Sequence, residues 1–160
     1  MTVVASKALH IRHAVPEDLA AIARIERASF SDPWSEDSLA TALDRMVVLV
    51  AAEGEGAGDG AVGVVGYVVA LVLAPDAEVA DLAVAPEARR RGVGRALLAR
   101  AIEVLANLTV RAVHLEVRES NRAARTLYES AGFCPVGRRR GYYRQPVEDA
   151  LLLRREIDPT

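Results

Sequence analysis

The sequence predicts a mixed α/β domain whose central sheet has about seven strands and is flanked by about four helices. The 160 residues are 51% hydrophobic and 26% charged, a composition typical of one domain with one packed core. Three apolar runs in succession precede residue 79, and a strand–helix–strand pattern follows them. This order indicates a sheet that is antiparallel at first and parallel later. We expect a single domain over 1–160, with loose tails at 1–8 and 156–160.

Two helices and three strands are predicted before residue 75. Pro16 and the acidic residues after it are typical of the first turn of a helix. In order, the predicted elements are a strand at 9–13, a helix from Pro16 to about Phe30, a helix capped by Ser35 that runs to about Arg45, and strands at 46–52 and 61–73. The acidic, glycine-rich segment at 53–60 is expected to be a flexible hairpin loop.

The stretch at 79–105 organises the chain. Its apolar run Leu82–Val84 is predicted to be a strand, and an amphipathic helix is expected after Gly94. Between them, Gly92 and Gly94 let backbone N–H groups turn toward one point, beside the positive helix end and the arginines Arg89–Arg91. This pattern predicts a cradle for a phosphate-bearing ligand. It lacks the Gly-Lys-Ser/Thr of a P-loop, and the alternative is a loop of solvated arginines that binds nothing.

The strand predicted at 111–118 alternates in polarity. One face would carry Val113, Leu115 and Val117, and the other would carry His114, Glu116 and Arg118. Since a central strand is usually apolar on both faces, the polar face indicates a cleft beside it. The alternative is an edge strand with a solvated face.

A helix is predicted to begin at Ser120–Asn121 and to end at Gly132. Asn121, Arg125 and Tyr128 recur at helical spacing, so we expect them to share one polar face. Strands at 133–140 and 150–154 follow, with a turn or bulge at 141–143.

The composition argues against several classes of protein. The net charge of −2 gives no overall attraction to nucleic acid, and the basic cluster at 138–140 is expected to be a solvated strand edge or turn. Cys134 is the only cysteine, which excludes an internal disulfide, and we expect it to be a buried small hydrophobe. The longest apolar run, at 61–74, is too short for a membrane helix. The histidines form no ligand-like cluster, so we expect no metal, and we expect a cytoplasmic protein.

Several separated motifs resemble one family. The loop Arg89–Arg95 resembles the acetyl-CoA pyrophosphate loop of the GNAT acyltransferase superfamily. A narrower resemblance, to the RimI-type ribosomal-protein-alanine N-acetyltransferases, is carried by Phe30–Ser35, Leu115–Arg118, Ser120–Asn121, Leu127–Phe133, Arg140–Tyr143 and Glu148–Ala150. The resemblance implies the GNAT fold and the transfer of acetyl from acetyl-CoA to the N-terminal amine of a protein. The acceptor would typically be the alanine of a small-subunit ribosomal protein.

The resemblance also implies roles for individual residues. The expected cofactor-binding residues are Leu82, Ala83 and Val84 for the pantetheine arm, Arg90, Arg91, Gly92, Val93, Gly94 and Arg95 for the pyrophosphate, and Asn121. Glu116 falls at the position of the family's proton acceptor and Tyr128 at that of its proton donor. Trp34, Tyr142 and Tyr143 are expected to contact the acceptor substrate.

Each of these roles has a structural alternative. Glu116 could instead form a surface ion pair with Arg118 or Arg111, and Tyr128 could serve core packing alone. Trp34 could be a staple between two helices. For the whole chain, the alternatives are a GNAT enzyme that acts on lysine or a small amine, and a non-catalytic module that binds CoA.

Overall fold

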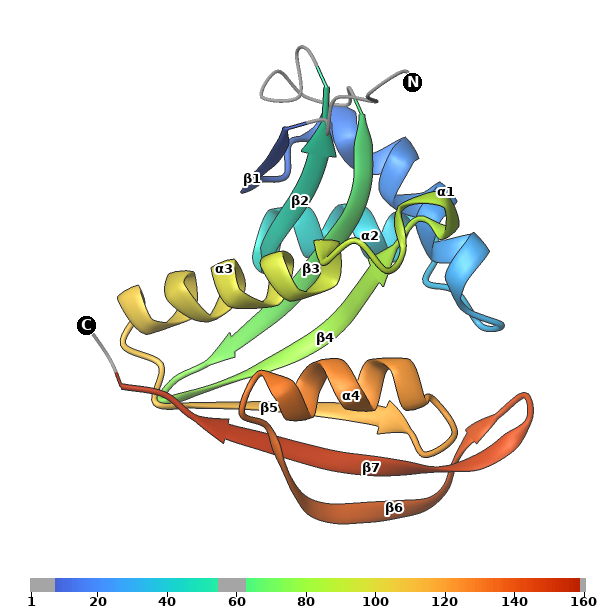
Figure 1. Cartoon of the computed structure of the whole chain (residues 1–160), viewed down its shortest axis with the longest axis vertical. Helices are drawn as coiled ribbons and strands as arrows, with labels where there is room; N and C mark the ends of the chain where they lie inside the picture. Colours follow the sequence, from blue (N-terminus) through green and yellow to red (C-terminus); the bar gives the residue numbers. More distant parts are fainter. Residues whose placement is uncertain (1–7, 55–62, 159–160) are drawn as a thin grey trace, which may run out of the picture.

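The computed structural model describes residues 8–54 and 63–158 as one seven-stranded sheet with helices on both faces (Figure 1). The predicted class is therefore confirmed, with four α-helices and the strand order β1-β2-β3-β4-β5-β7-β6. Neighbouring strands are antiparallel except for the pair β4 and β5, which is parallel. Most of the expected first tail and of the expected hairpin loop at 53–60 lies outside the described residues.

The elements follow one another in the predicted order. The strands are β1 (Leu9–His13), β2 (Val47–Glu53), β3 (Val64–Leu73), β4 (Asp76–Val84), β5 (Ala112–Arg118), β6 (Cys134–Arg144) and β7 (Val147–Glu156). The helices are α1 (Leu19–Ser29), α2 (Glu36–Arg45), α3 (Val93–Asn107) and α4 (Arg122–Ser130), with short 3-10 turns η1 (Pro16–Asp18) and η2 (Pro86–Ala88).

Local sequence signals account for several element boundaries. The Ser35 side chain accepts a hydrogen bond from the backbone N–H of Ser38 and caps α2, as predicted. Gly132, with φ of +90°, follows the end of α4, where a left-handed residue favours glycine.

The last two strands are longer than predicted. The segment at 141–143, expected to be a turn or bulge, lies within β6, where the pairing with β7 is irregular between Arg139 and Tyr143. The chain reverses at Gln145–Pro146 instead. Glu156 belongs to β7 and not to a loose tail.

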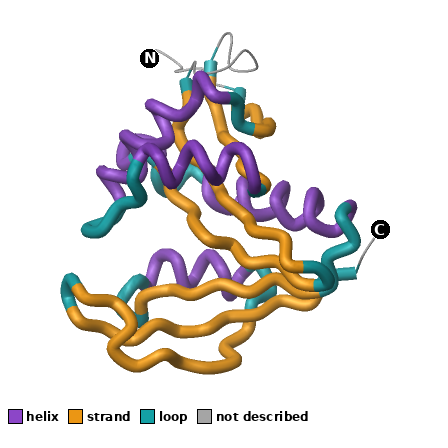
Figure 2. Tube along the Cα trace, turned by 180° about the vertical axis from the view of Figure 1, so that it is seen from behind, coloured by secondary structure: helices purple, strands orange, loops and turns teal. Residues whose placement is uncertain are grey.

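Two hydrophobic clusters lie on opposite faces of the sheet. One is built around α3, with Leu97, Leu98 and Leu105 fully buried against the strands. The other joins α1 and α2 to β2 and β3 through residues such as Ile22 and Leu39. Viewed from behind, α1 and α2 cover the sheet face that is hidden in Figure 1 (Figure 2).

The parallel pair β4 and β5 stays together over a short distance. Asp76–Glu78 pairs with Ala112–His114, and within the described residues the two strands make no further pairs. Beyond that point β4 continues beside β3, and β5 continues beside β7, so the sheet opens into two halves (Figure 1). The cofactor-binding segment predicted at Leu82–Val84 lies on the opened part of β4.

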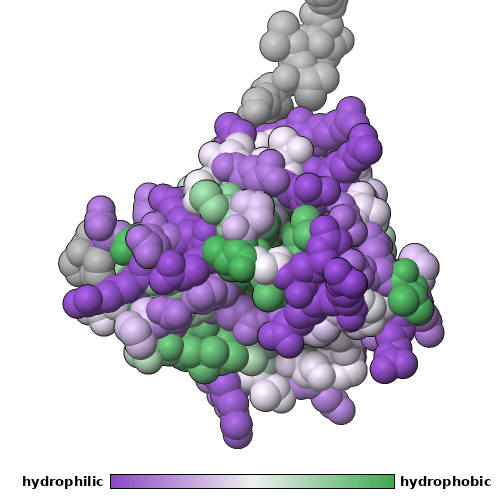
Figure 3. Space-filling model, turned by 90° about the horizontal axis from the view of Figure 1, so that it is seen from below, coloured by the Kyte–Doolittle hydropathy of each residue, from purple (hydrophilic) through white to green (hydrophobic). Residues whose placement is uncertain are grey.

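The edge strand β6 is strongly charged. Arg138, Arg139, Arg140 and Arg144 are all exposed on it, which confirms the expected solvated strand edge at 138–140. Hydrophilic side chains cover most of the face seen from below, and hydrophobic ones lie in small separate patches (Figure 3). Charged side chains on an edge strand oppose pairing with another sheet. None of the described helices is both long enough and apolar enough to cross a membrane.

Replacing Leu97 by alanine is expected to lower the free energy of unfolding by about 2–5 kcal/mol, because the removed atoms leave a cavity in the core. Urea denaturation measures this loss. The control is Leu108→Ala, because Leu108 lies just after α3 and is 48% exposed. We expect this variant to lower the free energy of unfolding by less than about 0.5 kcal/mol. Equal losses in the two variants would contradict the assigned core.

Candidate functional site

A cavity of about 630 Å³ lies between the opened end of β4, the first turn of α3 and one face of α4. It is lined by Ser29, Phe30, Leu82, Ala83, Val84, Ala88, Arg89, Arg90, Gly92, Val93, Gly94, Arg95, Asn121, Ala123, Ala124, Thr126, Leu127, Tyr128 and Ser130. The structure thus brings together the predicted strand, loop and helix residues, with Arg91 the exception among the predicted cofactor-binding residues.

The glycine loop forms a concave backbone surface at the start of α3. Gly92 has φ of +79° and Arg90 has φ of +62°, two left-handed residues in close succession. Among the described residues no side chain caps the first turn of α3, so its N–H groups are available to an anion. A Cβ on Gly94 would stand 3.3 Å from Leu127, so a side chain there would crowd the cavity.

The arginines of the loop have different partners. Arg91 forms an ion pair with Glu53, with 3.2 Å between its Nη2 and Oε1, and it does not line the cavity. Arg89 braces the loop, because its side chain donates to the carbonyl of Val84 and to the hydroxyl of Ser29. Arg90 lines the cavity, and Arg95 reaches across it to the Ser130 hydroxyl at 3.3 Å. Arg89 also lines the cavity, and its partners Val84 and Ser29 are neutral, so the positive charge at the cavity comes from Arg89, Arg90 and Arg95.

The opened edge of β4 contributes backbone groups. Leu82–Val84 pairs with β3 on one side, while the side toward β5 has no strand partner among the described residues. Unpaired N–H and C=O groups along a strand can bind another extended chain by adding it to the sheet.

Tyr128 belongs to α4, is buried, and lines the cavity. Its ring packs edge-on against Phe133, with 5.8 Å between centroids. Burial raises the pKa of Tyr128 above its usual value, and the Asp81 carboxyl adds to this effect when it is ionised. Asn121 accepts a hydrogen bond from Ala124 N–H and caps the same helix.

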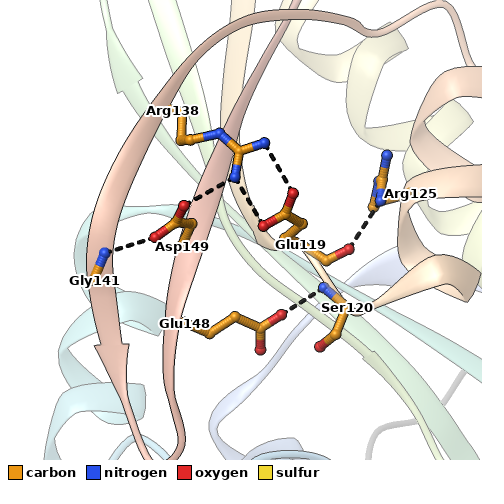
Figure 4. A network of polar contacts seen from close by, with 7 residues as sticks. All are labelled: Glu119, Ser120, Arg125, Arg138, Gly141, Glu148 and Asp149. Atoms are coloured by element: carbon orange, nitrogen blue, oxygen red, sulfur yellow. Dashed lines mark hydrogen bonds and ion pairs between the residues drawn. The ribbon is translucent and has the colours of Figure 1, made fainter.

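Arg125 departs from the polar face predicted for α4. Its side chain donates to the backbone carbonyl of Glu119 at 2.9 Å and does not line the cavity (Figure 4). The predicted polar face is therefore divided: Asn121 and Tyr128 border the cavity, whereas Arg125 secures the connection between β5 and α4.

Glu116 lies on the polar face of β5 and is not among the residues that line the cavity. Its carboxylate pairs with Arg139, with 3.0 Å between Oε1 and Nε, so the ion-pair partner is neither Arg118 nor Arg111. It also accepts a hydrogen bond from Tyr142, which raises the pKa of that phenol. The predicted base thus meets two groups of β6 that are remote in sequence.

The β6–β7 hairpin brings the two predicted tyrosines to this face. Tyr142 and Tyr143 pack edge to face at 5.1 Å between centroids, and the Arg118 guanidinium lies 4.2 Å from the Tyr143 ring centre. Burial, aided by the charge of Glu116, raises the pKa of Tyr143 to about 12.

A polar network fixes this hairpin to the β5–α4 connection (Figure 4). Its contacts are Arg138 with Glu119 and Asp149, Asp149 with Gly141 N–H, and Glu148 with Ser120 N–H. Single exposed ion pairs contribute little to stability, but several charges that share partners restrict the geometry.

Trp34 packs against the cluster around α1 and α2, as expected of a helix staple. Its backbone N–H donates to Glu26 at 3.0 Å. In the same segment, the Ser31 hydroxyl donates to the carbonyl of Gln145, at 2.9 Å, in the hairpin turn. The segment between α1 and α2 therefore touches the hairpin that carries Tyr142 and Tyr143.

Sequence reasoning missed four residues near the site. Arg139 could not be paired with Glu116 from spacing alone. Glu26, Tyr67 and Asp81 form a buried polar cluster. A signal existed for Glu26, which lies one helical turn after the buried Ile22.

The expectation for Cys134 was wrong, because its side chain is exposed on the edge strand β6.

Comparisons with known proteins agree with this architecture. The ribosomal protein bS18-alanine N-acetyltransferase of Escherichia coli (strain K12) is 34% identical over 138 residues, which are 85% of this chain and 89% of that protein. A protein of Mycobacterium tuberculosis named N-alpha-acetyltransferase RimI is 45% identical over 84 residues, 52% of this chain and 51% of that protein. The crystal structure of the ribosomal-protein-S18-alanine N-acetyltransferase from Escherichia coli superposes with a TM-score of 0.84 at 31% identity, and covers 96% of each chain.

The family itself is matched over residues 19–133, which span α1 through the start of the last hairpin. This range contains the opened strand, the glycine loop and both helices that border the cavity. The chain therefore belongs to the acetyltransferase (GNAT) family, as its separated motifs predicted.

Proposed function

We propose that this chain transfers the acetyl group of acetyl-CoA to the N-terminal amine of a protein, with the N-terminal alanine of a small-subunit ribosomal protein as the acceptor. The observation that carries the proposal is the similarity, over most of the chain, to enzymes named for that reaction. Glu116 and Tyr128, on either side of the opened sheet, supply the acid–base groups that the reaction needs.

The cavity fits the carrier of the acetyl group. The uncapped first turn of α3, with Arg90 and Arg95, suits a pyrophosphate. The opened edge at Leu82–Val84 suits the two amides of a pantetheine arm, which can add to β4 as a short strand. Asn121 at the start of α4 lines the same cavity. Arg91 acts outside the cavity, where its pair with Glu53 steadies the loop.

Glu116 is the proposed base. An N-terminal amine has a pKa of about 7.7–8.0, against about 10.4 for lysine, so producing its free base at neutral pH costs about 3 kcal/mol less. A single carboxylate therefore suffices to accept the proton, directly or through one water. Arg139 and Tyr142 hold the Glu116 carboxylate in place between β5 and β6.

Tyr128 is the proposed acid. The amine nitrogen forms a bond to the carbonyl carbon of the thioester, the carbon–sulfur bond breaks, and Glu116 receives the proton from nitrogen. Tyr128 gives its proton to the departing sulfur, which leaves as a thiol, and the catalyst is restored when Glu116 releases its proton to solvent and the Tyr128 phenolate takes one up.

The acceptor would enter from the face opposite the α3 cavity. The Trp34 segment touches the β6–β7 hairpin through the hydrogen bond from Ser31 to Gln145, and the same hairpin carries the paired rings of Tyr142 and Tyr143. An acceptor bound beside these tyrosines would therefore also lie near the Trp34 segment.

Reversing the charge of Arg90, in the variant Arg90→Glu, is expected to weaken acetyl-CoA binding about tenfold or more at low salt. A charge-assisted hydrogen bond contributes about 1.5–3 kcal/mol, and tenfold in affinity is about 1.4 kcal/mol. The effect should shrink as salt is raised. Calorimetry at two ionic strengths measures it.

Two other arginines serve as comparisons for Arg90. Arg91→Glu is expected to weaken acetyl-CoA binding less than Arg90→Glu does, because Arg91 faces Glu53 and not the cavity. Arg100→Glu changes an exposed arginine of α3 that pairs with Glu103, and its affinity should equal that of the wild type. If Arg90→Glu and Arg100→Glu bound acetyl-CoA equally well, the cradle would be assigned to the wrong residues.

Glu116→Gln is expected to lower kcat by about 10²–10⁴-fold, because the amide cannot accept the proton. Acetyl-CoA affinity should stay unchanged, since Glu116 lies outside the cavity. Steady-state rates at several pH values, with calorimetry, test both statements. Glu103→Gln on the exposed face of α3 is the matched control. Unchanged turnover in Glu116→Gln would remove this residue from the mechanism.

Two peptides that differ only in the acetylation of the N-terminal amine test which amine accepts the acetyl group. One carries a free N-terminal alanine and the other an acetylated one, and both contain an internal lysine. With radiolabelled acetyl-CoA, we expect label on the free peptide alone, because the free terminus has the lower amine pKa. Label on the lysine of the blocked peptide would favour a lysine or small-amine acetyltransferase instead.

A further inference from the structure

Three buried polar side chains meet beneath the site and have no part in the acid–base chemistry proposed above. Glu26 comes from α1, Tyr67 from β3 and Asp81 from β4, and their exposed fractions are 1%, 0% and 9%. Asp81 directly precedes the opened segment Leu82–Val84. Buried carboxyl groups need hydrogen-bond partners, so the contacts of this cluster constrain its protonation.

The contacts favour a proton on one of the two carboxyls. The Tyr67 hydroxyl lies within hydrogen-bond distance of Glu26 Oε2 and is 3.2 Å from Asp81 Oδ2, so its single proton is shared between two acids. Glu26 and Asp81 are also close enough to hydrogen-bond to each other. Two adjacent carboxylates buried away from water repel each other, and a proton on one of them removes this repulsion.

Asp81 is the carboxyl better suited to hold that proton. Glu26 already accepts two hydrogen bonds, from the Tyr67 hydroxyl and from the backbone N–H of Trp34. Burial, together with the hydrogen bond and charge of Glu26, raises the pKa of Asp81 to about 9. The other groups that act on Asp81 are the Tyr67 hydroxyl and the Leu82 N–H, and the charge of Asp81 in turn affects Tyr128.

The cluster connects the two sides of the proposed site. Glu26 Oε1 holds the backbone of Trp34, in the segment that also reaches the hairpin through Ser31. Asp81 is part of the strand that borders the cavity. The hydrogen bonds therefore link Asp81 through Tyr67 and Glu26 to the Trp34 segment.

We propose that Glu26, Tyr67 and Asp81 share one proton between the two carboxyls, and that this proton fixes the Trp34 segment in position for the acceptor. Asp81 is then a positioning residue. The statement about the acceptor rests on the proposed function, whereas the statement about Trp34 does not.

The direction of the pH effect follows from the raised pKa of Asp81. The folded state holds a proton that the unfolded state releases near the ordinary pKa of an aspartate, so the stabilising effect of protonation is lost as pH rises toward about 9. Above that pH the cluster carries two negative charges, and Tyr67 can donate to only one of them. The repulsion loosens the hold of Glu26 on Trp34.

Trp34 is the only tryptophan of the chain, so its fluorescence reports on this segment without substrate. Spectra of the free protein are recorded between about pH 7 and about pH 10.5. We expect the wild-type emission to shift to the red with a midpoint near pH 9, the pKa of Asp81. Asp81→Asn keeps a neutral hydrogen-bond donor at this position and should show no such transition.

Two further variants keep the experiment decisive. Asp76→Asn changes a partly exposed aspartate of the same strand, which pairs with His114, and should titrate like the wild type. Glu26→Gln removes the charge that raises the pKa of Asp81, so the midpoint should move to lower pH. It also provides a second test if Asp81→Asn fails to fold, which circular dichroism detects. A transition that persists in Asp81→Asn, is absent from the wild type, or keeps its midpoint in Glu26→Gln would overturn the proposal.

A kinetic measurement tests the effect on the acceptor. Between about pH 8 and about pH 9.5 the KM of the wild type for a peptide with N-terminal alanine should rise severalfold more than that of Asp81→Asn. The affinity for acetyl-CoA should change equally in both. Equal KM profiles would overturn the positioning role. If the chain acetylated no peptide, the proposed function would fail while the fluorescence result would still stand.

Discussion

The separation of β4 from β5 is the constraint on which the site depends. The two strands pair over Asp76–Glu78 and Ala112–His114 and then diverge, so Leu82–Val84 is held by β3 on one side and faces the cavity on the other. A parallel strand buried within a continuous sheet would have its backbone groups satisfied on both sides. The opening therefore gives an interior strand an unpaired edge at the cavity while the rest of β4 stays in the core.

Each half of the opened sheet is stabilised by its own contacts. The α1 and α2 cluster covers the half that contains β2 and β3, and the β6–β7 hairpin holds β5 through a full antiparallel ladder. Helix α3 spans the opening, with its first turn at the cavity and Leu97 buried against the strands. The walls of the cavity are therefore held by packing and strand pairing within the protein.

The two sides of this opening differ in charge. Arg90, Arg95 and the N-terminal end of α3 make the cavity electropositive, whereas the Glu116 carboxylate on the other face is paired with Arg139. In the proposed function, the positive side would hold the anionic carrier and Glu116 would meet the amine. The Glu26, Tyr67 and Asp81 cluster lies between these regions, where a permanently charged pair of carboxyls would be costly to bury.

The sequence by itself determined the fold class, most of the helices and strands, and those cavity residues that lie close together along the chain. Apolar periodicity, the Ser35 and Gly132 boundaries and the glycine loop are local signals, because hydrogen-bond geometry and backbone freedom act over a few residues. Tertiary structure decided the pairs: Glu116 with Arg139, Arg91 with Glu53, and Tyr67 between two acids. Their members lie from 14 to 41 residues apart in the chain. Which charges meet at such separations depends on strand order and register, and a sequence without its fold contains no distance between them.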